Sequence, residues 1–470
     1  MTRAASQSRI LLFAIFTIVA VDALALPQTV TTLGKRPATA TGAAKPIPQT
    51  PVADVKSVGE LRALAEQGDA KAQHSLGLKY DAGEGVTQDD TQAMTWFRKA
   101  ADQGFAVAQY DLGLMYLNGQ GMPEDVAQAV AWFRKAADQG HANAQNNLGA
   151  LYSSGQGVSK DDAQAVAWFR KAAEQGSRDA ECSLAVMYVT GQGVPKDGMQ
   201  AAAWFRRAAE HGLARAQLNL GLMYKGDQGI PRDVLQSVAW TRKAAEQGYG
   251  EAQNNLGVMY ATGDGVQKDD IKAYVWLSLT EASTYGEQAA NNLAAIASQL
   301  TPAQLTNAVS GIRVRAEQGD AQAQFTLGLK YNRGKGVPKD DVQAAVWIRR
   351  AAEQDFAMAE QTLGEMYRTG QGVQADDLQA VAWFRRGAEH GYADAQISLG
   401  SMYVTGRGVP QDNVQALKWD IIAVSRASDR SRAGFDEVRS AVEKRMTIAQ
   451  AADARKQAKQ WAVGFAKRSK

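Results

Sequence analysis

Tryptophan recurs along this chain at a nearly constant interval. Nine of its ten Trp residues lie at positions 96, 132, 168, 204, 240, 276, 347, 383 and 419, so every step is 36 residues except one of 71. A fixed period of this length is typical of stacked supersecondary units rather than of an ordinary globular core. Each unit of such a stack buries its apolar face against its neighbours.

Residues 141–176 show what one period contains. Ala144, Leu148 and Tyr152 are spaced four residues apart, which places them on one face of a helix. After a Gly-Gln-Gly segment, Trp168 lies on the apolar face of a second helix. Each period is therefore a helical hairpin. The sequence predicts an all-α fold, a right-handed α-solenoid of helical hairpins with a 36-residue period.

Local signals mark the ends of these helices. Asp161 precedes the second helix and is followed three residues later by Gln164, a spacing that predicts a capping box. Gly176 predicts where the second helix ends. Gly149 lies inside the first helix, where glycine costs about 1 kcal/mol relative to alanine. We therefore expect a second helix to approach closely at Gly149.

The repeats share one pattern, A-x-A-Q-x-x-L-G-x-x-Y-x-x-G-x-G-V-x-x-D-x-x-x-A-x-x-W-F-R-K-A-A-E-Q-G. This pattern resembles the Sel-one-like repeat (SLR) family, a relative of the tetratricopeptide repeat, and nine copies cover about residues 69–427. The resemblance implies a protein–protein adaptor. Many bacterial members are secreted or periplasmic, and some act in envelope assembly, exopolysaccharide regulation or host interaction.

The chain divides into six predicted segments. Residues 1–25 are expected to be a secretory signal peptide, because a basic start and an apolar run precede a small-residue cleavage pattern that ends at Ala25. Cleavage near Ala25 would export the protein to the periplasm or the medium. The other segments are a flexible tether at 26–56, a first array of six repeats at 57–284, an eroded repeat or cap at 285–319, a second array of three repeats at 320–427 and a basic helical tail at 428–470.

The long step between Trp276 and Trp347 is one residue short of two periods. Gly311 stands where the missing Trp of this eroded repeat would be. Because a buried Trp contributes much local packing, we expect a weak joint or bend near Gly311. The stretches that follow Trp276 and Trp419 resemble each other, so both arrays are expected to close with similar caps.

Groups that carry catalysis are scarce in this sequence. A single cysteine, Cys182, rules out a disulfide framework within the chain and a zinc site built on several thiolates. No nucleophile elbow, metalloprotease motif or phosphate-binding loop is present. We therefore predict no enzyme activity, no cofactor and no metal site. The enzymatic alternative is a cell-wall or β-lactam hydrolase. The family members linked to penicillin binding, however, have a disulfide in each repeat, and a chain with one cysteine is not of that subtype.

The predicted partner-binding surface lies on the first helices, which usually line the concave face of a solenoid. The residue before the repeated Leu is polar, which suits hydrogen bonds to a peptide, with bridging between neighbouring helices as the alternative. The residue after a repeat boundary is often aromatic, which suits interface contacts, with packing between hairpins as the alternative. The candidate residues are Asp111, Asn147, Asn219, Asn255, Thr326, Thr362 and Ser398 in the first set and Phe105, Tyr249, Phe356 and Tyr392 in the second.

Positive charge is concentrated at the C-terminus. The whole chain has 52 Lys and Arg against 49 Asp and Glu, whereas residues 426–470 carry 12 basic and 5 acidic side chains. Such a tail, at 428–470, suits contact with anionic lipid or glycan, with a solvated terminal helix as the alternative. The mixture of basic and aromatic residues that marks a nucleic-acid module is missing, so no nucleic-acid partner is expected. The sequence thus predicts an adaptor for one or more protein partners, without naming them.

Overall fold

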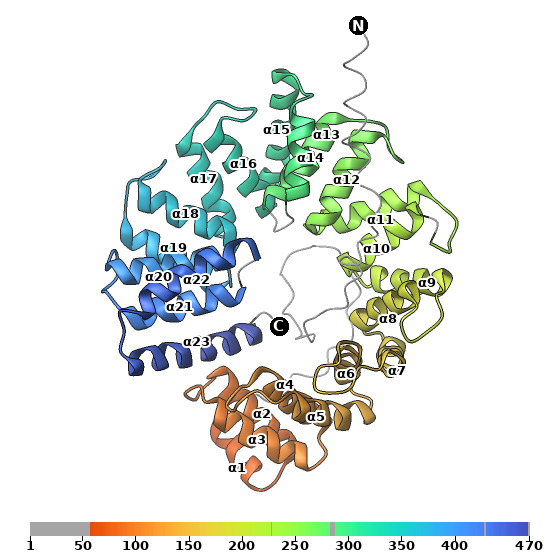
Figure 1. Cartoon of the computed structure of the whole chain (residues 1–470), viewed down its shortest axis with the longest axis vertical. Coiled ribbons are helices and arrows are strands. Elements are labelled where there is room, and N and C mark those ends of the chain that lie inside the picture. Colours follow the sequence, from red (N-terminus) through yellow and green to blue (C-terminus); the bar gives the residue numbers. More distant parts are fainter. Residues whose placement is uncertain (1–56, 227, 283–286, 427–428, 469–470) are drawn as a thin grey trace. The chain divides into compact units, whose positions relative to one another are not determined.

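The computed structural model describes residues 57–226, 228–282, 287–426 and 429–468 (Figure 1). These residues form 23 α-helices and one short 3-10 helix, η2 (Thr280–Ala282), and contain no strand. The predicted signal peptide and tether lie outside the described residues. No helix in the described ranges is long and apolar enough to cross a membrane. The chain separates into two compact units, unit 1 up to Asp233 and unit 2 from Val234 to Arg468.

Unit 1 consists of α1 (Val58–Glu66) followed by helical hairpins. The first helices are α2 (Ala70–Ala82), α4 (Ala106–Asn118), α6 (Ala142–Ser154), α8 (Arg178–Thr190) and α10 (Ala214–Lys225). The second helices are α3 (Asp90–Asp102), α5 (Val126–Asp138), α7 (Asp162–Glu174) and α9 (Gly198–Glu210). Within this unit, α6 and α8 lie in one layer and α7 and α9 in the other (Figure 1).

Unit 2 begins with α11 (Val234–Glu246). Its regular hairpins are α12 (Gly250–Thr262) with α13 (Asp270–Leu279), α16 (Ala321–Arg333) with α17 (Asp341–Ala352), α18 (Ala357–Thr369) with α19 (Asp377–Glu389), and α20 (Ala393–Thr405) with α21 (Asn413–Arg426). Two less regular pairs are α14 (Glu287–Ala297) with α15 (Pro302–Glu317), and α22 (Asp429–Glu443) with α23 (Ile448–Arg468). The predicted all-α architecture of hairpins is confirmed, and its handedness stays a prediction.

The glycine inside the first helix lies where a second helix approaches, as predicted. A Cβ atom added to Gly149 on α6 would lie 2.8 Å from Cδ1 of Phe169 on α7. Phe169 is completely buried, and so is Leu148 beside the glycine. Close contact between α6 and α7 therefore favours a residue without a side chain at this point.

The capping box predicted at the start of each second helix is only half present. The backbone N–H of Gln164 donates to Oδ1 of Asp161 at 3.0 Å, as an N-cap should. The backbone N–H of Asp161, however, donates to the carbonyl of Tyr152 on the first helix at 3.0 Å. The aspartate therefore fixes the second helix to the first instead of completing a box with Gln164. A full capping box forms at Thr301, where the side chain of Gln304 accepts a hydrogen bond from the backbone N–H of Thr301 at 2.9 Å.

A hydrogen bond from an Arg to a Tyr joins neighbouring hairpins. Arg170 on α7 donates to the hydroxyl of Tyr188 on α8 at 2.8 Å, and Arg385 on α19 donates to Tyr403 on α20 at 3.0 Å. The same bond recurs at Arg62–Tyr80, Arg98–Tyr116, Arg134–Tyr152, Arg206–Tyr224, Arg242–Tyr260, Arg313–Tyr331 and Arg349–Tyr367.

The interruption of the period lies inside unit 2. Although α14 and α15 intervene in sequence, Gln322 on α16 donates to the side chain of Gln253 at 3.1 Å and to the carbonyl of Leu279 at 2.9 Å. The fully buried Lys330 on α16 also lies 2.5 Å from Oε2 of Glu281 in η2. These bonds attach α16 to the hairpin of α12 and α13. The weak joint expected near Gly311 stays a prediction.

The basic tail folds into α22 and α23, which pack against α21 much as α14 and α15 pack against α13. Ala451, Ala454 and Ala458 on the inner face of α23 are buried. Trp461 lies 5.4 Å from Trp419, measured between ring centroids. One face of α23 therefore completes the apolar core of unit 2, while Arg455, Lys456 and Lys459 on the same helix are exposed.

Candidate functional site

The first set of predicted partner-binding residues divides by burial. Asn147, Asn219 and Thr326 are 0%, 3% and 0% exposed, so a partner has no access to them in this structure. Asp111, Asn255, Thr362 and Ser398 are partly exposed. The accessible part of the predicted row is therefore confined to these last four positions.

Two of the four accessible residues bridge neighbouring first helices. A carboxylate oxygen of Asp111 on α4 lies 2.7 Å from Nε2 of His74 on α2. Ser398 on α20 accepts a hydrogen bond from the amide of Gln361 on α18 at 3.0 Å. The alternative function of this row, bridging between helices, is thus realised at both residues, and each keeps exposed surface beside the bridge.

The aromatic candidates Phe105, Tyr249, Phe356 and Tyr392 occupy the N-cap positions of α4, α12, α18 and α20, and all are partly exposed. The ring of Phe105 lies 5.4 Å from that of His74, and the ring of Phe356 lies 5.5 Å from that of Phe325. Part of each of these two rings therefore packs between hairpins. Only the remaining part can contact a partner.

A polar hollow recurs beside the Arg–Tyr bond, next to the loop that precedes a second helix. In unit 2 it has a volume of about 590 Å³ and is lined by Arg349, Tyr367, residues 373–375, Asp376 and Gln379. In unit 1 an equivalent hollow of about 630 Å³ is lined by residues that include Arg62, Tyr80, residues 86–88, Asp89 and Gln92. Two hairpins thus present the same combination of guanidinium, phenol, carboxylate and amide groups to solvent.

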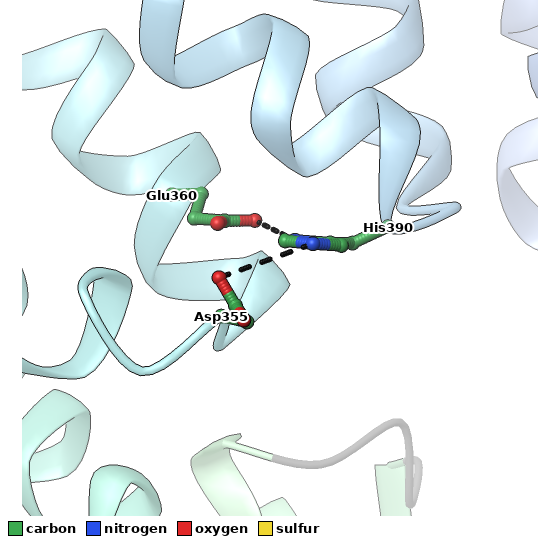
Figure 2. Close-up of side chains that lie close together, drawn as sticks. All are labelled: Asp355, Glu360 and His390. Carbon is green, nitrogen blue, oxygen red and sulfur yellow. Dashed lines mark hydrogen bonds and ion pairs between the residues drawn. The ribbon is translucent and has the colours of Figure 1, made fainter. Parts of the chain in front are cut away.

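A cluster of ionisable groups outside these rows lies where α17, α18 and α19 meet (Figure 2). Glu360 on α18 is 0% exposed, and its Oε2 lies 2.7 Å from Nδ1 of His390, the residue that caps α19. Nε2 of His390 lies 4.0 Å from Oδ1 of Asp355, which follows α17. Arg386 on α19 lies 2.6 Å from Asp355 and 3.2 Å from Oε1 of Glu360.

The electrostatics of this cluster favour a charged imidazole. The hydrogen bond with Glu360 raises the pKa of His390 above its usual 6.5, and the charges of Glu360 and Asp355 act in the same direction. Partial burial and the charge of Arg386 oppose this increase in the pKa. Nδ1 is within hydrogen-bond distance of Glu360, and Nε2 lies within ion-pair distance of Asp355, so both carboxylates stabilise the protonated ring.

A metal ion is the other ligand that these residues could hold. One ligand atom from each of Asp355, Glu360 and His390 lies within 4.8 Å of the others. Arg386, however, is already ion-paired with both carboxylates, and a divalent cation would have to displace its guanidinium. The arrangement therefore fits a proton better than it fits a metal.

Neither His390 nor Glu360 was among the site residues predicted from the sequence. A signal was nevertheless present, because His211 and His390 each follow a glutamate by 30 residues. Most other repeats have Gln at both of these positions, as in the pair Gln109 and Gln139. The joint replacement of two glutamines marks the cluster without any structural information.

Comparison with known proteins identifies the repeat. The family described as Sel1 repeat matches residues 70–105, 106–141, 142–177, 178–213, 214–249, 250–280, 321–356, 357–392 and 393–419, in agreement with the nine predicted copies. The crystal structure of c5321, a protective antigen present in uropathogenic Escherichia coli strains and displaying an SLR fold, is similar, with 35% identity and a TM-score of 0.51. That similarity covers 88% of this chain and 96% of c5321.

A Sel1 repeat protein from Oxalobacter formigenes is also 35% identical, over 48% of this chain and 94% of its own, with a TM-score of 0.45. No curated protein sequence matches the chain. The nine family matches together span more than half of the residues. The chain therefore belongs to the Sel1 repeat family.

Proposed function

We propose that this chain is a non-enzymatic scaffold that binds one or more protein partners outside the cytoplasm. The observation that carries the proposal is the set of partly exposed polar and aromatic residues on several first helices of unit 2, such as Asn255, Phe356 and Thr362. A stack of hairpins presents such residues at regular intervals, which suits an extended segment of a partner.

The relatives and the N-terminal sequence support this proposal. Sel1 repeats resemble tetratricopeptide repeats, whose usual role is protein binding. The similar protein c5321 is described as a protective antigen, which accords with a location reached by export. Residues 1–25 of this chain supply the signal-peptide pattern that export requires.

Site-specific photocrosslinking would test the proposed surface. A photoreactive amino acid at Asn255 or Thr362 in residues 26–470 should capture a discrete partner from envelope extract or medium of the cells of origin. The matched control is the same amino acid at Leu378, which is 70% exposed and lies on a second helix. Equal capture from all three positions, or none from Asn255 and Thr362, would contradict a binding surface on the first helices.

Contact with anionic lipid or glycan through residues 428–470 is a second candidate function. Arg455, Lys456 and Lys459 on α23 are exposed, while the opposite face of this helix is buried. The basic face thus remains available after the tail has folded. The double substitution Lys456→Glu and Lys459→Glu should abolish cosedimentation with anionic vesicles if this contact exists, and neutral vesicles provide the control. Unchanged cosedimentation would exclude the basic face of α23.

Hydrolysis of cell-wall or β-lactam substrates is the enzymatic alternative. Membership of a family built as a binding scaffold favours the non-enzymatic function. We expect purified residues 26–470 to leave a chromogenic β-lactam intact. Turnover that survives further purification would require the proposal to be abandoned.

A further inference from the structure

A pair of glutamines forms a recurring hydrogen-bonded junction in this stack. Gln109 on α4 donates to the carbonyl of Ala101 on α3 at 3.1 Å, and it accepts from Gln139, the cap of α5, at 2.7 Å. One buried amide therefore connects its own hairpin with the preceding one. The same pair of side chains is bonded at Gln73–Gln103, Gln145–Gln175 and Gln324–Gln354.

Two hairpins, one in each compact unit, replace both glutamines. In unit 1 the pair is Glu181 and His211, with 3.1 Å between Oε2 and Nδ1. In unit 2 the pair is Glu360 and His390, and the corresponding distance is 2.7 Å. Both glutamates are completely buried. A buried carboxylate needs compensating charge or hydrogen bonds, so the partner residues decide whether the junction holds.

The replacement changes the chemistry of the junction. An amide side chain donates and accepts, whereas an ionised carboxylate only accepts, so glutamate cannot donate to the carbonyl of the preceding hairpin. In unit 1, Arg207 takes over this task and donates to the carbonyl of Ala173 at 3.3 Å. A neutral imidazole has one donor, and an imidazolium has two. The charge and the donors that the histidine supplies to a Glu–His junction therefore depend on its protonation state.

Only the junction in unit 2 has a second carboxylate. Asp355 occupies the position that glycine has in other repeats, and it keeps the left-handed backbone conformation, with φ of 62°. In unit 1 the corresponding residue is Gly176, with φ of 83°. Asp355 thus adds a negative charge 4.0 Å from Nε2 of the His390 ring, at the end of the preceding hairpin.

We propose that the Glu360–His390 junction is a proton-operated lock between the hairpin of α16 and α17 and the hairpin of α18 and α19. With His390 protonated, the ring interacts with Glu360 through one nitrogen and with Asp355 through the other. Loss of the proton removes one donor and leaves the buried carboxylate of Glu360 with Arg386 as its remaining charged partner. The contact between the two hairpins then weakens.

The charges around His390 set the direction of this dependence. Asp355 from the end of α17 and Glu360 from α18 favour its protonated form, and Arg386 on its own helix opposes it. From α21, Arg426 approaches the adjacent Gly391 and adds a second positive charge nearby. Because the pKa of His390 is raised above its usual 6.5, the lock should be complete below pH 6.5 and be lost as the pH rises through the raised pKa.

The lock lies beside the proposed binding surface. Phe356, from the candidate aromatic set, is next to Asp355, and Thr362 lies on the same helix as Glu360. An open junction would change how α18 presents these residues. The effect of the lock on the binding surface rests on the proposed function, whereas the lock itself does not.

Hydrogen exchange can test the lock without a partner. The full mature chain is compared with the double variant Glu360→Gln and His390→Gln, which restores the glutamine pair found in the neighbouring hairpin at Gln324 and Gln354. Comparing the two proteins at the same pH cancels the intrinsic effect of pH on exchange. The ratio of wild-type to variant exchange rates in peptides from 352–391 should increase between about pH 6 and pH 8.5.

Two further variants keep the test decisive. Asp355→Gly removes the second carboxylate and restores the common residue, so it should move the increase in exchange to lower pH. Glu181→Gln with His211→Gln, in unit 1, should leave peptides from 352–391 unchanged. A rate ratio that does not depend on pH, or a pH dependence that Asp355→Gly does not shift, would overturn the lock. If Zn²⁺ raises the melting temperature of the wild-type chain but not that of the Gln/Gln variant, the cluster binds metal and the proposal fails.

Discussion

Asp420 on α21 stands directly opposite Gly400 on α20, where most other hairpins place an aromatic or aliphatic side chain. In the preceding hairpin, for instance, the side chain opposite Gly364 is Phe384. Asp420 is 0% exposed, and neither of its carboxylate oxygens makes a hydrogen bond with the described residues. A carboxyl group thus fills a site that the repeat shapes for an apolar side chain.

Replacing Asp420 with Leu should stabilise the protein more at high pH than at low pH. Burial raises the pKa of Asp420 from 3.8 to about 7. Below pH 3.8 the group is protonated in both folded and unfolded chains and contributes nothing to the pH dependence. As the pH rises toward 7, Asp420 ionises in the unfolded chain before it ionises in the folded one. The free energy of unfolding therefore falls by up to about 4 kcal/mol and stays constant at higher pH.

The measurement is thermal unfolding of the wild type and Asp420→Leu at about pH 4.5 and pH 8, which bracket most of the predicted loss. The difference in melting temperature between the two proteins should be larger at the higher pH. Asp420→Asn serves as the control, because it removes the charge but keeps an unsatisfied polar group. It should remove the pH dependence with a smaller gain in stability. An equal difference at both pH values would show that Asp420 has a partner in solution.

Gly149→Ala should destabilise unit 1. The added Cβ would lie 2.8 Å from the buried ring of Phe169, and overpacking of this kind costs about 1–3 kcal/mol. The cost should fall near the lower end, because Ala185 occupies the same repeat position opposite Phe205 and shows that the hairpin can accommodate a methyl group. Urea unfolding monitored by Trp fluorescence would measure the change.

The matched control is Gly434→Ala. Gly434 lies inside α22, and no atom lies within 4 Å of a Cβ added there. Alanine should therefore gain about 1 kcal/mol from helix propensity alone. If both substitutions changed stability in the same direction, close packing against Phe169 would not explain why the repeat has a glycine.

The hairpins could be predicted from the sequence because their signals are local. The spacing of Ala144, Leu148 and Tyr152 depends on neighbours within one helix, and α6 contains all three residues. Asp161 likewise caps α7 through its own backbone neighbours. The apolar spacing also determines which face of each helix is buried, so the amino-acid pattern alone is enough to recognise nine repeats.

The polar residues of the candidate site could not be predicted in the same way. Asn147 and Thr362 occupy the same repeat position, yet the first is fully buried and the second is partly exposed. Their exposure depends on side chains of neighbouring hairpins, which the pattern within one repeat does not specify. The position of Asp355 beside His390 likewise depends on how the three consecutive helices α17, α18 and α19 pack together.

Substitutions at the ion pair between η2 and α16 should have unequal effects. Lys330 is 0% exposed, whereas the side chain of Glu281 is 18% exposed and also contacts Arg333 at 2.9 Å. Glu281→Ala leaves a buried ammonium group without its carboxylate, which should cost about 3–5 kcal/mol. Lys330→Met should cost less, because Glu281 keeps Arg333 and methionine fills most of the lysine volume.

Hydrogen exchange of peptides from α16 would rank the two variants at constant pH. Glu281→Gln provides the control, since it keeps the shape of the side chain but removes the charge that Lys330 requires. Its effect should lie close to that of Glu281→Ala. Faster exchange in Lys330→Met than in Glu281→Ala would show that the unpaired ammonium group of Lys330 is not the source of the lost stability.

Cys182 should not react with thiol reagents or form an intermolecular disulfide while the protein is folded. Its side chain is 0% exposed on α8, and burial raises the pKa of the thiol, although Arg215 opposes this shift. Burial keeps reagents away from the sulfur, and the raised pKa keeps the reactive thiolate rare.

The matched control is Cys182→Ala with Arg178→Cys, which places the single thiol at an exposed position on the same helix. A colorimetric thiol reagent should modify the control at least about 100-fold faster than the wild type, and urea should remove the difference. Rapid modification of the native wild type, or disulfide-linked dimers under non-reducing conditions, would show that α8 opens readily.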